Sequence, residues 1–240
     1  MGAAVLTANS ALRAGSGLVT LCVPDEIKNI ANSMSLEVVV AGFSQIDERI
    51  RECDAIAIGP GLSKSRNISK LINGLMLSEN IEVPMVIDAD GLNAIDKPEI
   101  FKKSGKDIVI TPHPGEFSRL IGKPADEIQR DRMGHASRFA IEHGITVVLK
   151  GAYTVIAGKD KQLFVNPIGN PAMASAGVGD VLTGIIASLI GQGLSSFNAA
   201  VAGAYIHGMA ANLATSIKGQ YGLIASDIID SIPYTIESII

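Results

Sequence analysis

The chain has 240 residues and a formal net charge of −4, and 47% of its residues are hydrophobic. This length fits one large α/β domain or two small ones, and the hydrophobic share is enough for a sizeable core. No run of basic residues is longer than two, which argues against a nucleic-acid-binding or anionic-membrane surface. The two cysteines, Cys22 and Cys53, lie in apolar segments, which indicates buried thiols in a reducing compartment. We therefore expect a cytoplasmic protein without nucleic-acid or membrane partners.

Strands and helices alternate along the predicted chain. Short runs of β-branched and aliphatic residues end in glycine or polar residues, and helical segments separate them. Continuous apolar strands that alternate with helices are typical of an α/β fold, with a mostly parallel central sheet and helices on both faces. In chain order the sequence predicts strands at 18–23, 37–40, 55–58, 84–87, 107–110 and 146–149, and helices at 24–34, 45–51 and 65–77.

The last third of the chain predicts a hairpin followed by long helices. Residues 155–156 and 163–165 are strand-like and flank Gly158-Lys159-Asp160. Residues 194–217 carry no Asp, Glu, Lys or Arg, and their number would suffice to cross a bilayer. Their content of Ala, Gly, Asn and His favours a helix buried inside the protein instead. No linker interrupts the pattern, so we expect a single domain over residues 1–240.

Polar residues and glycines follow four of the predicted strands. The segments Gly59-Pro60-Gly61, Asp88-Ala89-Asp90, His113-Pro114-Gly115-Glu116 and Lys150-Gly151 each stand where a strand ends. Because open α/β sheets bind ligands beyond the carboxyl ends of their strands, these residues should converge on one edge. Each segment alone has an ordinary explanation, such as turn glycines, helix-capping aspartates, a solvated loop histidine or a lysine at a strand end. Their joint occurrence at equivalent positions favours a site.

A small, glycine-rich and almost uncharged segment, residues 166–180, ends in Asp180 at the start of an apolar helix predicted at 181–192. The start of a helix has free N–H groups and a positive dipole end, and glycines let the backbone approach a phosphate. The segment therefore predicts an anion site. A carboxylate there either caps the helix or takes part in phosphoryl chemistry, by holding Mg²⁺ or by accepting a proton. The segment alone fits both interpretations.

With these segments in this order, the chain resembles the ADP-dependent NAD(P)H-hydrate dehydratases of the ribokinase-like superfamily. The glycine-aspartate core at 177–180 is common to the superfamily, whereas the His-Pro-Gly-Glu and Gly-Asn-Pro elements are more specific. The resemblance therefore implies a ribokinase-like fold. The matching segments are Gly2-Ala3-Ala4, 11–20, 59–62, 88–93, 111–116, Lys150-Gly151 and 169–184.

The resemblance implies the repair of a damaged cofactor. NADH or NADPH that is hydrated on the nicotinamide ring, called NADHX or NADPHX, carries a hydroxyl at C6. A phosphoryl group passes from ADP or ATP to this hydroxyl, and loss of phosphate restores the double bond. With ADP the products are NAD(P)H, AMP and phosphate. Mg²⁺ is expected as the cofactor because phosphoryl transfer needs its charge neutralised. No His, Cys and Asp cluster has the spacing of a transition-metal site.

The resemblance also implies a role for individual residues. Asp180 would take the proton from the substrate hydroxyl, and the N–H groups of Gly177 to Asp180 would stabilise the transferring phosphoryl group. The hydrated nicotinamide would contact Ala3, Gly61, His113 and Asp180. The adenine nucleotide, ADP or AMP, would contact Lys150, Gly151, Ala152, Tyr153, Thr154, Gly177 and Gly179.

Two features depart from the family pattern. Val178 stands where a threonine or serine is expected, so the loop lacks a hydroxyl that could bind phosphate. The family also has a strand and a glycine turn ahead of the helix that begins Gly2-Ala3-Ala4, and we expect this strand to be missing from the sheet. Because an open strand edge favours pairing with other chains, we expect a homo-oligomer, with a tetramer among the possible forms.

Two alternative functions remain open at this point. One would give a different product, and the other would give none. An ATP-dependent kinase acting on a hydroxymethylpyrimidine or a thiazole would share the fold and Asp180. The His113-Pro114-Gly115-Glu116 and Lys150-Gly151 elements favour the dehydratase over this kinase. A non-catalytic adenine-nucleotide-binding module would bind ADP without turnover, and Val178 is compatible with it.

Overall fold

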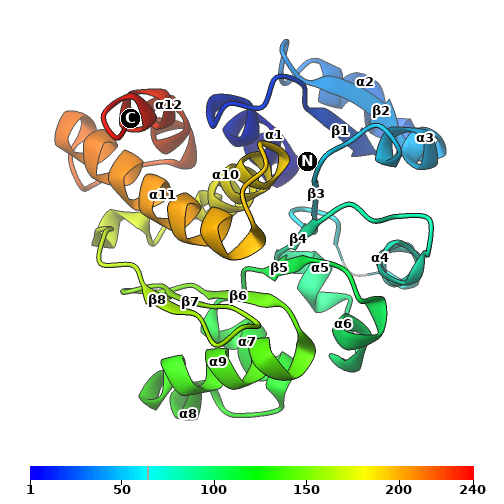
Figure 1. Cartoon of the computed structure of the whole chain (residues 1–240). Coiled ribbons are helices and arrows are strands. Elements are labelled where there is room, and N and C mark those ends of the chain that lie inside the picture. Colours follow the sequence, from blue (N-terminus) through cyan, green and yellow to red (C-terminus); the bar gives the residue numbers. More distant parts are fainter. Residues whose placement is uncertain (64) are drawn as a thin grey trace.

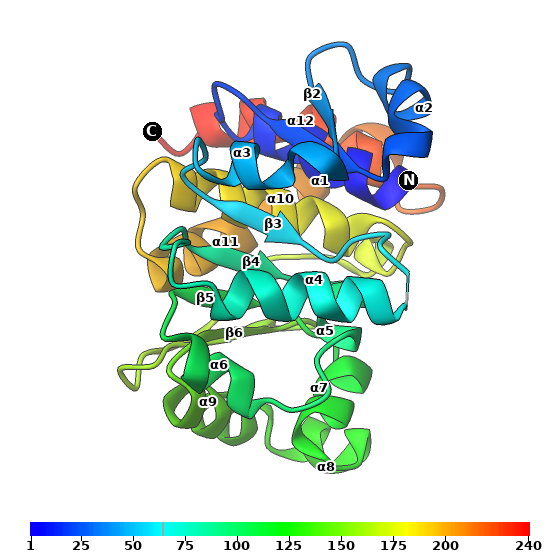
Figure 2. The same cartoon turned by 90° about the vertical axis from the view of Figure 1, so that its right-hand side faces the viewer.

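A computed structural model describes residues 1–63 and 65–240. Its centre is a six-stranded sheet in which the strands lie in chain order, and Figures 1 and 2 show helices on both sides of it. The first four strands are parallel, and the last two form an antiparallel hairpin. This confirms the predicted α/β class and the late hairpin. The strands are β3 (Ile56–Ile58), β4 (Met85–Ile87), β5 (Ile108–Ile110), β6 (Thr146–Leu149), β7 (Val155–Ala157) and β8 (Leu163–Val165).

The four inner strands of the sheet, β4 to β7, are buried on both faces, which explains their continuous runs of apolar and β-branched residues. Val86, Val109 and Val148 pack in one core with helices α10 (Val178–Gly191) and α11 (Ser196–Lys218). The alternate positions of the same strands pack in a second core on the opposite face. Most of the helical residues in this second core come from α4 (Arg66–Leu77), α6 (Glu99–Ser104), α7 (Pro114–Ile121), α8 (Ala125–Arg130) and α9 (Arg132–His143).

The predicted buried helix near the C-terminus is confirmed. The helix α11 has 23 residues, and its small side chains pack against α10 and the sheet. In the described part of the chain, no helix combines the length and the apolar composition needed to cross a bilayer. Two further helices, α1 (Gly2–Arg13) and α12 (Ala225–Glu237), lie against α10, as Figure 1 shows.

The first two strands do not belong to the central sheet, so the prediction of one sheet that includes them is wrong. β1 (Thr20–Val23) and β2 (Val39–Gly42) pair with each other in a separate parallel sheet. A groove of about 630 Å³ lies between the outer edges of β1 and β3 and is lined by both strands, so these edges do not meet. The unpaired edges of β1 and β3 both border this groove.

Element boundaries differ from the predicted ones at several places. The predicted helix at 24–34 is broken into a short 3-10 turn, η1 (Asp25–Ile27), and α2 (Lys28–Asn32). The helix α10 starts three residues earlier than expected, because Gly177 adopts φ +85° as its N-cap and turns the chain into the helix. The remaining elements are α3 (Ile46–Ile50), α5 (Ala89–Asn93), η2 (Phe43–Gln45) and η3 (Pro171–Met173).

Candidate active site

The glycine loop and Asp180 form the start of α10, as the sequence predicts. Asp180 lies in the first turn of the helix, where the first backbone N–H groups have no acceptor within the helix. The N-cap residue is Gly177, and its φ of +85° is strained for a residue with a Cβ, so the position favours glycine. The Val178 side chain is buried in the core, so it packs with apolar neighbours in place of facing the loop.

The Asp180 carboxyl group is a stronger base than an ordinary aspartate. Partial burial is the main cause that raises its pKa, to about 6. The negative charge of Asp88 raises the pKa further, the positive charge of Lys150 opposes it, and Asp90 and Glu116 add smaller increases. A carboxylate with a pKa near neutrality can accept a proton from a hydroxyl more effectively than one with an ordinary pKa.

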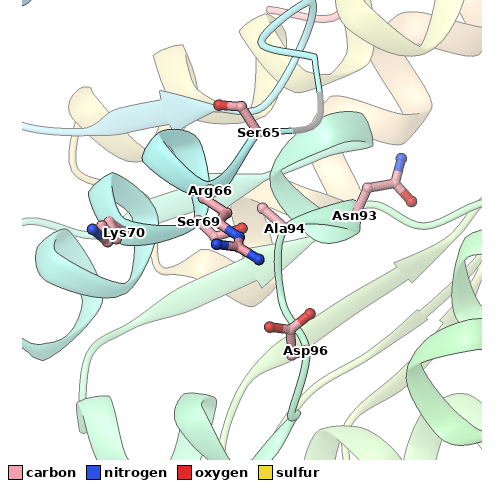
Figure 3. A pocket seen from close by; sticks show the side chains of 7 residues that line it. All are labelled: Ser65, Arg66, Ser69, Lys70, Asn93, Ala94 and Asp96. Atoms are coloured by element: carbon pink, nitrogen blue, oxygen red, sulfur yellow. The ribbon is translucent and has the colours of Figure 1, made fainter.

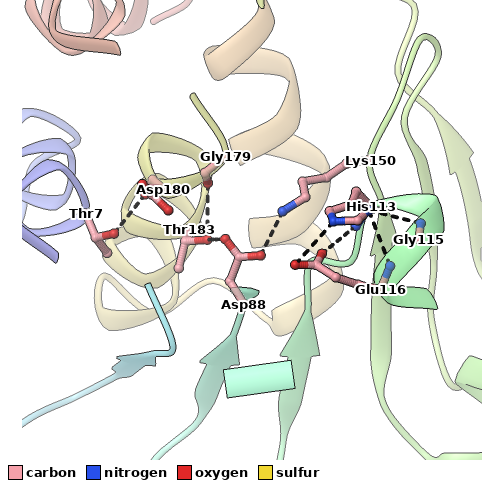
Figure 4. A network of polar contacts seen from close by, with 9 residues as sticks. All are labelled: Thr7, Asp88, His113, Gly115, Glu116, Lys150, Gly179, Asp180 and Thr183. Carbon is pink, nitrogen blue, oxygen red and sulfur yellow. Dashed lines mark hydrogen bonds and ion pairs between the residues drawn. The ribbon is translucent and has the colours of Figure 1, made fainter. Parts of the chain in front are cut away.

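Lys150 links the end of β6 to the glycine loop. Its ammonium lies 2.7 Å from the Asp88 carboxylate, which follows β4. A Cβ placed on Gly179 would lie 3.3 Å from the Lys150 Nζ, so the ammonium is next to the loop backbone. Figure 4 shows that the side chains of Asp88 and Lys150 point toward each other below the start of α10. The arrangement places a positive charge where the sequence predicts a phosphate.

Helix capping, the ordinary explanation for Asp88, does not apply, which favours the prediction that this residue belongs to a site at the strand ends. Asp88 occupies the N-cap position of α5, but its side chain accepts no hydrogen bond from that helix. The carboxylate instead accepts hydrogen bonds from Lys150 and, at 2.8 Å, from the Thr183 hydroxyl. Asp90, two residues on, accepts a hydrogen bond from the Ser63 backbone N–H at 2.8 Å.

His113 is a capping residue and not a free loop histidine. It is the N-cap of α7, and its Nδ1 accepts hydrogen bonds from the backbone N–H groups of Gly115 and Glu116 at 3.0 and 3.3 Å. The Glu116 carboxylate accepts a hydrogen bond from the backbone N–H of His113 at 2.8 Å and completes a capping box. With Nδ1 an acceptor, the ring proton is placed on Nε2, which lies 3.6 Å from Glu116 Oε1, and the ring is exposed enough for a ligand to reach this N–H group.

Ala3 and Gly61, predicted to contact the same substrate, are neighbours in the structure. A Cβ placed on Gly61 would lie 3.4 Å from the Ala3 Cβ, and Gly61 has φ +73°. Thr7 connects this pair to the glycine loop, because its hydroxyl lies 3.1 Å from the carbonyl oxygens of both Ala3 and Asp180. The structure thus brings Ala3, Gly61 and the start of α10 together.

The predicted nucleotide-contacting segment, residues 150–154, forms the turn between β6 and β7. Two of its residues have positive φ, +147° at Gly151 and +56° at Tyr153. Thr154 donates a hydrogen bond to the Gly151 carbonyl at 3.0 Å, so the turn is closed internally. Ala152 and Tyr153 are exposed at this turn.

Arg132 holds this turn in place, and the sequence analysis did not identify it. Its guanidinium donates hydrogen bonds to the carbonyl oxygens of Ala152 and Leu149, at 2.6 and 2.8 Å. Arg132 lies on α9 and outside the turn, so no local sequence pattern marks it as a partner of the turn. Thr7 and Thr183 were missed for the same reason, since single threonines in apolar helices carry no motif.

A second hollow, shown in Figure 3, lies apart from these residues. Its volume is about 440 Å³, and the start of α4 and the end of α5 line it. None of the residues predicted for the substrate or the nucleotide belongs to it. Its lining residues are Ser65, Arg66, Ser69, Lys70, Asn93, Ala94 and Asp96.

The described residues do not form a protein metal centre. Within residues 1–63 and 65–240, no group of three His, Cys, Asp or Glu side chains has the geometry to hold a metal ion. The Asp88 carboxylate is already bound by an ammonium and a hydroxyl. The expected Mg²⁺ therefore does not fit a resident site made by the protein alone, and we derive no chemical step through it.

Comparison with known proteins identifies the family. A family model described as NAD(P)H-hydrate dehydratase matches residues 1–234. The chain belongs to the NAD(P)H-hydrate dehydratase family. It is 36% identical to the ADP-dependent (S)-NAD(P)H-hydrate dehydratase of Neisseria meningitidis, over 95% of this chain and 78% of that protein. It is 44% identical to the bifunctional NAD(P)H-hydrate repair enzyme Nnr of Moorella thermoacetica, over 99% of this chain and 47% of that protein. The chain thus spans about half the length of these bifunctional relatives.

Solved structures agree with the dehydratase family and show the ribokinase-like fold. A Bacillus subtilis ADP/ATP-dependent NAD(P)H-hydrate dehydratase, co-crystallised with ATP and Mg²⁺, aligns with TM-score 0.87 and 29% identity. The alignment covers 100% of this chain and 85% of that one. A hydroxyethylthiazole kinase of Pyrococcus horikoshii aligns with TM-score 0.70 and 17% identity over 97% of this chain and 96% of that one, which shows a shared fold alone.

Proposed function

We propose that the chain catalyses the nucleotide-dependent dehydration of NAD(P)HX to NAD(P)H. The observation that carries this proposal is the half-buried Asp180, with its pKa raised to about 6, at a helix start beside the Lys150 ammonium. A base, a glycine loop and a cation at one point are the components that phosphoryl transfer to a hydroxyl needs. The family match and the names of the dehydratase relatives support the same reaction.

In this proposal the chemical steps follow from the geometry. The terminal phosphoryl group of ADP lies against the N–H groups at the start of α10, where Lys150 neutralises part of its charge. Asp180 takes the proton of the C6 hydroxyl as its oxygen attacks phosphorus, and AMP leaves. Phosphate then departs from C6, and loss of a ring proton restores the double bond. The overall products are NAD(P)H, AMP and inorganic phosphate.

The substrate side of this proposed site is formed by Ala3, Gly61 and His113. Ala3 and Gly61 are neighbours, and the Thr7 hydroxyl bonds to the carbonyl oxygens of Ala3 and Asp180. The Nε2–H of His113 provides a hydrogen-bond donor for a polar group of the nicotinamide. On the nucleotide side, residues 150–154 and Gly177 to Gly179 provide the contacts.

We propose further that Mg²⁺ enters with the phosphates of the nucleotide, since Mg²⁺ sites of this kind need few protein ligands. The Bacillus subtilis dehydratase was co-crystallised with ATP and Mg²⁺, which supports this view. The choice between ADP and ATP, the homo-oligomeric state and the cytoplasmic location stay predictions.

The test is a direct assay with hydrated NADH and a nucleotide. Dehydration restores the absorbance of the reduced nicotinamide ring, and chromatography then identifies the nucleotide product. The proposal expects AMP and free phosphate from ADP. A phosphorylated product without recovery of the ring absorbance would indicate a kinase, and binding of ADP without turnover would indicate a binding module.

A further inference from the structure

The Asp88 carboxylate is almost completely buried, with an exposed side-chain fraction of 1%, and has a role that capping does not explain. One oxygen accepts from the Lys150 ammonium at 2.7 Å, and the other accepts from the Thr183 hydroxyl at 2.8 Å. Both oxygens are therefore bound by side chains from two other elements, β6 and α10. A buried charge is tolerated only when it is paired and hydrogen-bonded in this way.

The backbone around Asp88 is shaped to present this side chain. Ala89 adopts φ +47°, a conformation that is costly for a residue with a Cβ. A Cβ on Gly59 would overlap the Asp88 carbonyl, and a Cβ on Gly91 would lie 2.9 Å from the Ile58 carbonyl oxygen. The ends of β3 and β4 thus pack backbone to backbone, which fixes the position of Asp88.

The two partners of Asp88 both reach the glycine loop. The Lys150 ammonium lies next to Gly179, at 3.3 Å from the position of a Cβ there, and 20% of the Lys150 side chain is exposed. The Thr183 hydroxyl, one helical turn further on, lies 3.3 Å from the Gly179 carbonyl oxygen. Figure 4 shows Asp88 between Lys150 and Thr183, with Gly179 and Asp180 above them.

We propose that Asp88 is a positioning residue, which holds the Lys150 ammonium at the glycine loop and ties the start of α10 to the end of β4. This inference rests on the proposed function, because it assigns the loop to a phosphate. Without Asp88, Lys150 is free to move into solvent, since a lysine side chain is flexible and part of it is already exposed.

The charges that face Asp180 give this proposal a second, measurable consequence. Asp88 from the end of β4, Lys150 from β6, Asp90 from α5 and Glu116 from α7 all act on the Asp180 carboxyl group. Among these four charges, Asp88 has the largest effect, and it raises the pKa of Asp180. Neutralising Asp88 should therefore lower the pKa of Asp180 even when Lys150 also moves away, because the effect of Asp88 is larger than the opposing effect of Lys150. Removing a hydrogen bond without a charge should not have this effect.

The experiment is a double-mutant cycle on Asp88 and Lys150, with T183V as the matched control. The variants are D88N, K150M and D88N/K150M, and the first readout is the dissociation constant of ADP by calorimetry. The second readout is the pH profile of kcat with hydrated NADH for the wild-type protein, D88N and T183V. T183V removes the second hydrogen bond of Asp88 and leaves every charge unchanged.

The proposal expects a coupled result. D88N should weaken ADP binding by about 10- to 100-fold, the range of a charge-assisted hydrogen bond. In the K150M background the same substitution should change ADP binding by less than about 3-fold, because the ammonium that Asp88 positions is gone. The acidic limb of the kcat profile should move to lower pH in D88N and stay in place in T183V.

Three results would overturn the proposal. These are equal effects of D88N in both backgrounds, unchanged ADP binding in D88N, or an acidic limb that moves equally in D88N and T183V. If D88N does not fold, K150M and D88N/K150M still report the effect of Asp88 in the absence of the ammonium, and a difference above about 3-fold in ADP binding between them contradicts the proposal. Failure of the proposed function is recognised separately, because the wild-type protein would then bind ADP without forming NADH.

Discussion

Asp180→Asn is the substitution that separates a catalytic base from a structural residue of the helix start. Asparagine keeps the shape of the side chain and cannot accept the proton of the substrate hydroxyl. General-base catalysis contributes about 10²- to 10⁴-fold, so kcat should fall by at least about 10²-fold while ADP still binds. The size of this loss of activity should also depend on pH, because the Asp180 carboxyl group has a pKa of about 6.

For the wild-type protein this pKa fixes the acidic limb of the activity profile. At pH 7 about 90% of Asp180 is ionised, and below pH 6 each unit of pH should reduce kcat about tenfold. The residual activity of D180N should lack this limb. The assay is the recovery of nicotinamide absorbance from hydrated NADH over a series of buffers, with calorimetry of ADP binding as the control.

The same substitution should stabilise the fold at high pH. The folded-state pKa of Asp180 is raised from 3.8, so the folded protein holds this proton more tightly than the unfolded chain does. Stability contributed by the protonated group is therefore lost as pH rises through the interval from about 4 to about 6, and the loss persists at pH 8. D180N lacks this loss, so its Tm should exceed that of the wild-type protein at pH 8 and converge with it near pH 4. Near-normal turnover together with a lower Tm at pH 8 would refute the reasoning, because it is the behaviour of a helix-stabilising residue.

The other predictions concern the loops and the sheet edges. G179V should abolish ADP binding with the fold retained, because a Cβ at Gly179 already lies 3.3 Å from the Lys150 Nζ and the branched carbons would fill the phosphate position; unchanged affinity in calorimetry would place the phosphate elsewhere. R132M should weaken ADP binding by about tenfold, because the carbonyls of Leu149 and Ala152 lose their donors and the turn at 150–154 loosens; equal affinity, with folding verified by circular dichroism, would show that Arg132 has no part in it. The chain should self-associate through the open edges of β1 and β3, because unpaired strand edges favour pairing with other chains. A monodisperse monomer in light scattering would contradict this last expectation.

Local sequence was sufficient for the central sheet and for the position of most predicted site residues. The runs at 84–87 and 146–149 carry no charged residue and are almost entirely apolar or β-branched, which is typical of a strand buried on both faces, and β4 and β6 form there. Their ends then bring Asp88 and Lys150 to one edge by the topology of the sheet alone. This is why a candidate site could be predicted before any contact was known.

Long-range partners could not be predicted in the same way. Whether Asp88 caps its own helix or binds Lys150 and Thr183 depends on residues 62 and 95 positions away, and only the folded chain brings them together. The separate pairing of β1 with β2 was missed because a strand pattern does not specify its neighbour. Arg132 was missed because its hydrogen bonds go to backbone carbonyls, which leave no trace in sequence.

The most direct test of the central claim is the stoichiometry of one reaction. Purified protein is incubated with hydrated NADH, ADP and Mg²⁺, and NADH, AMP and phosphate are quantified at several times. The proposed function predicts that the three products appear in equal amounts and that D180N forms almost none of them. ADP consumption without NADH, or NADH formation without AMP and phosphate, would contradict the account.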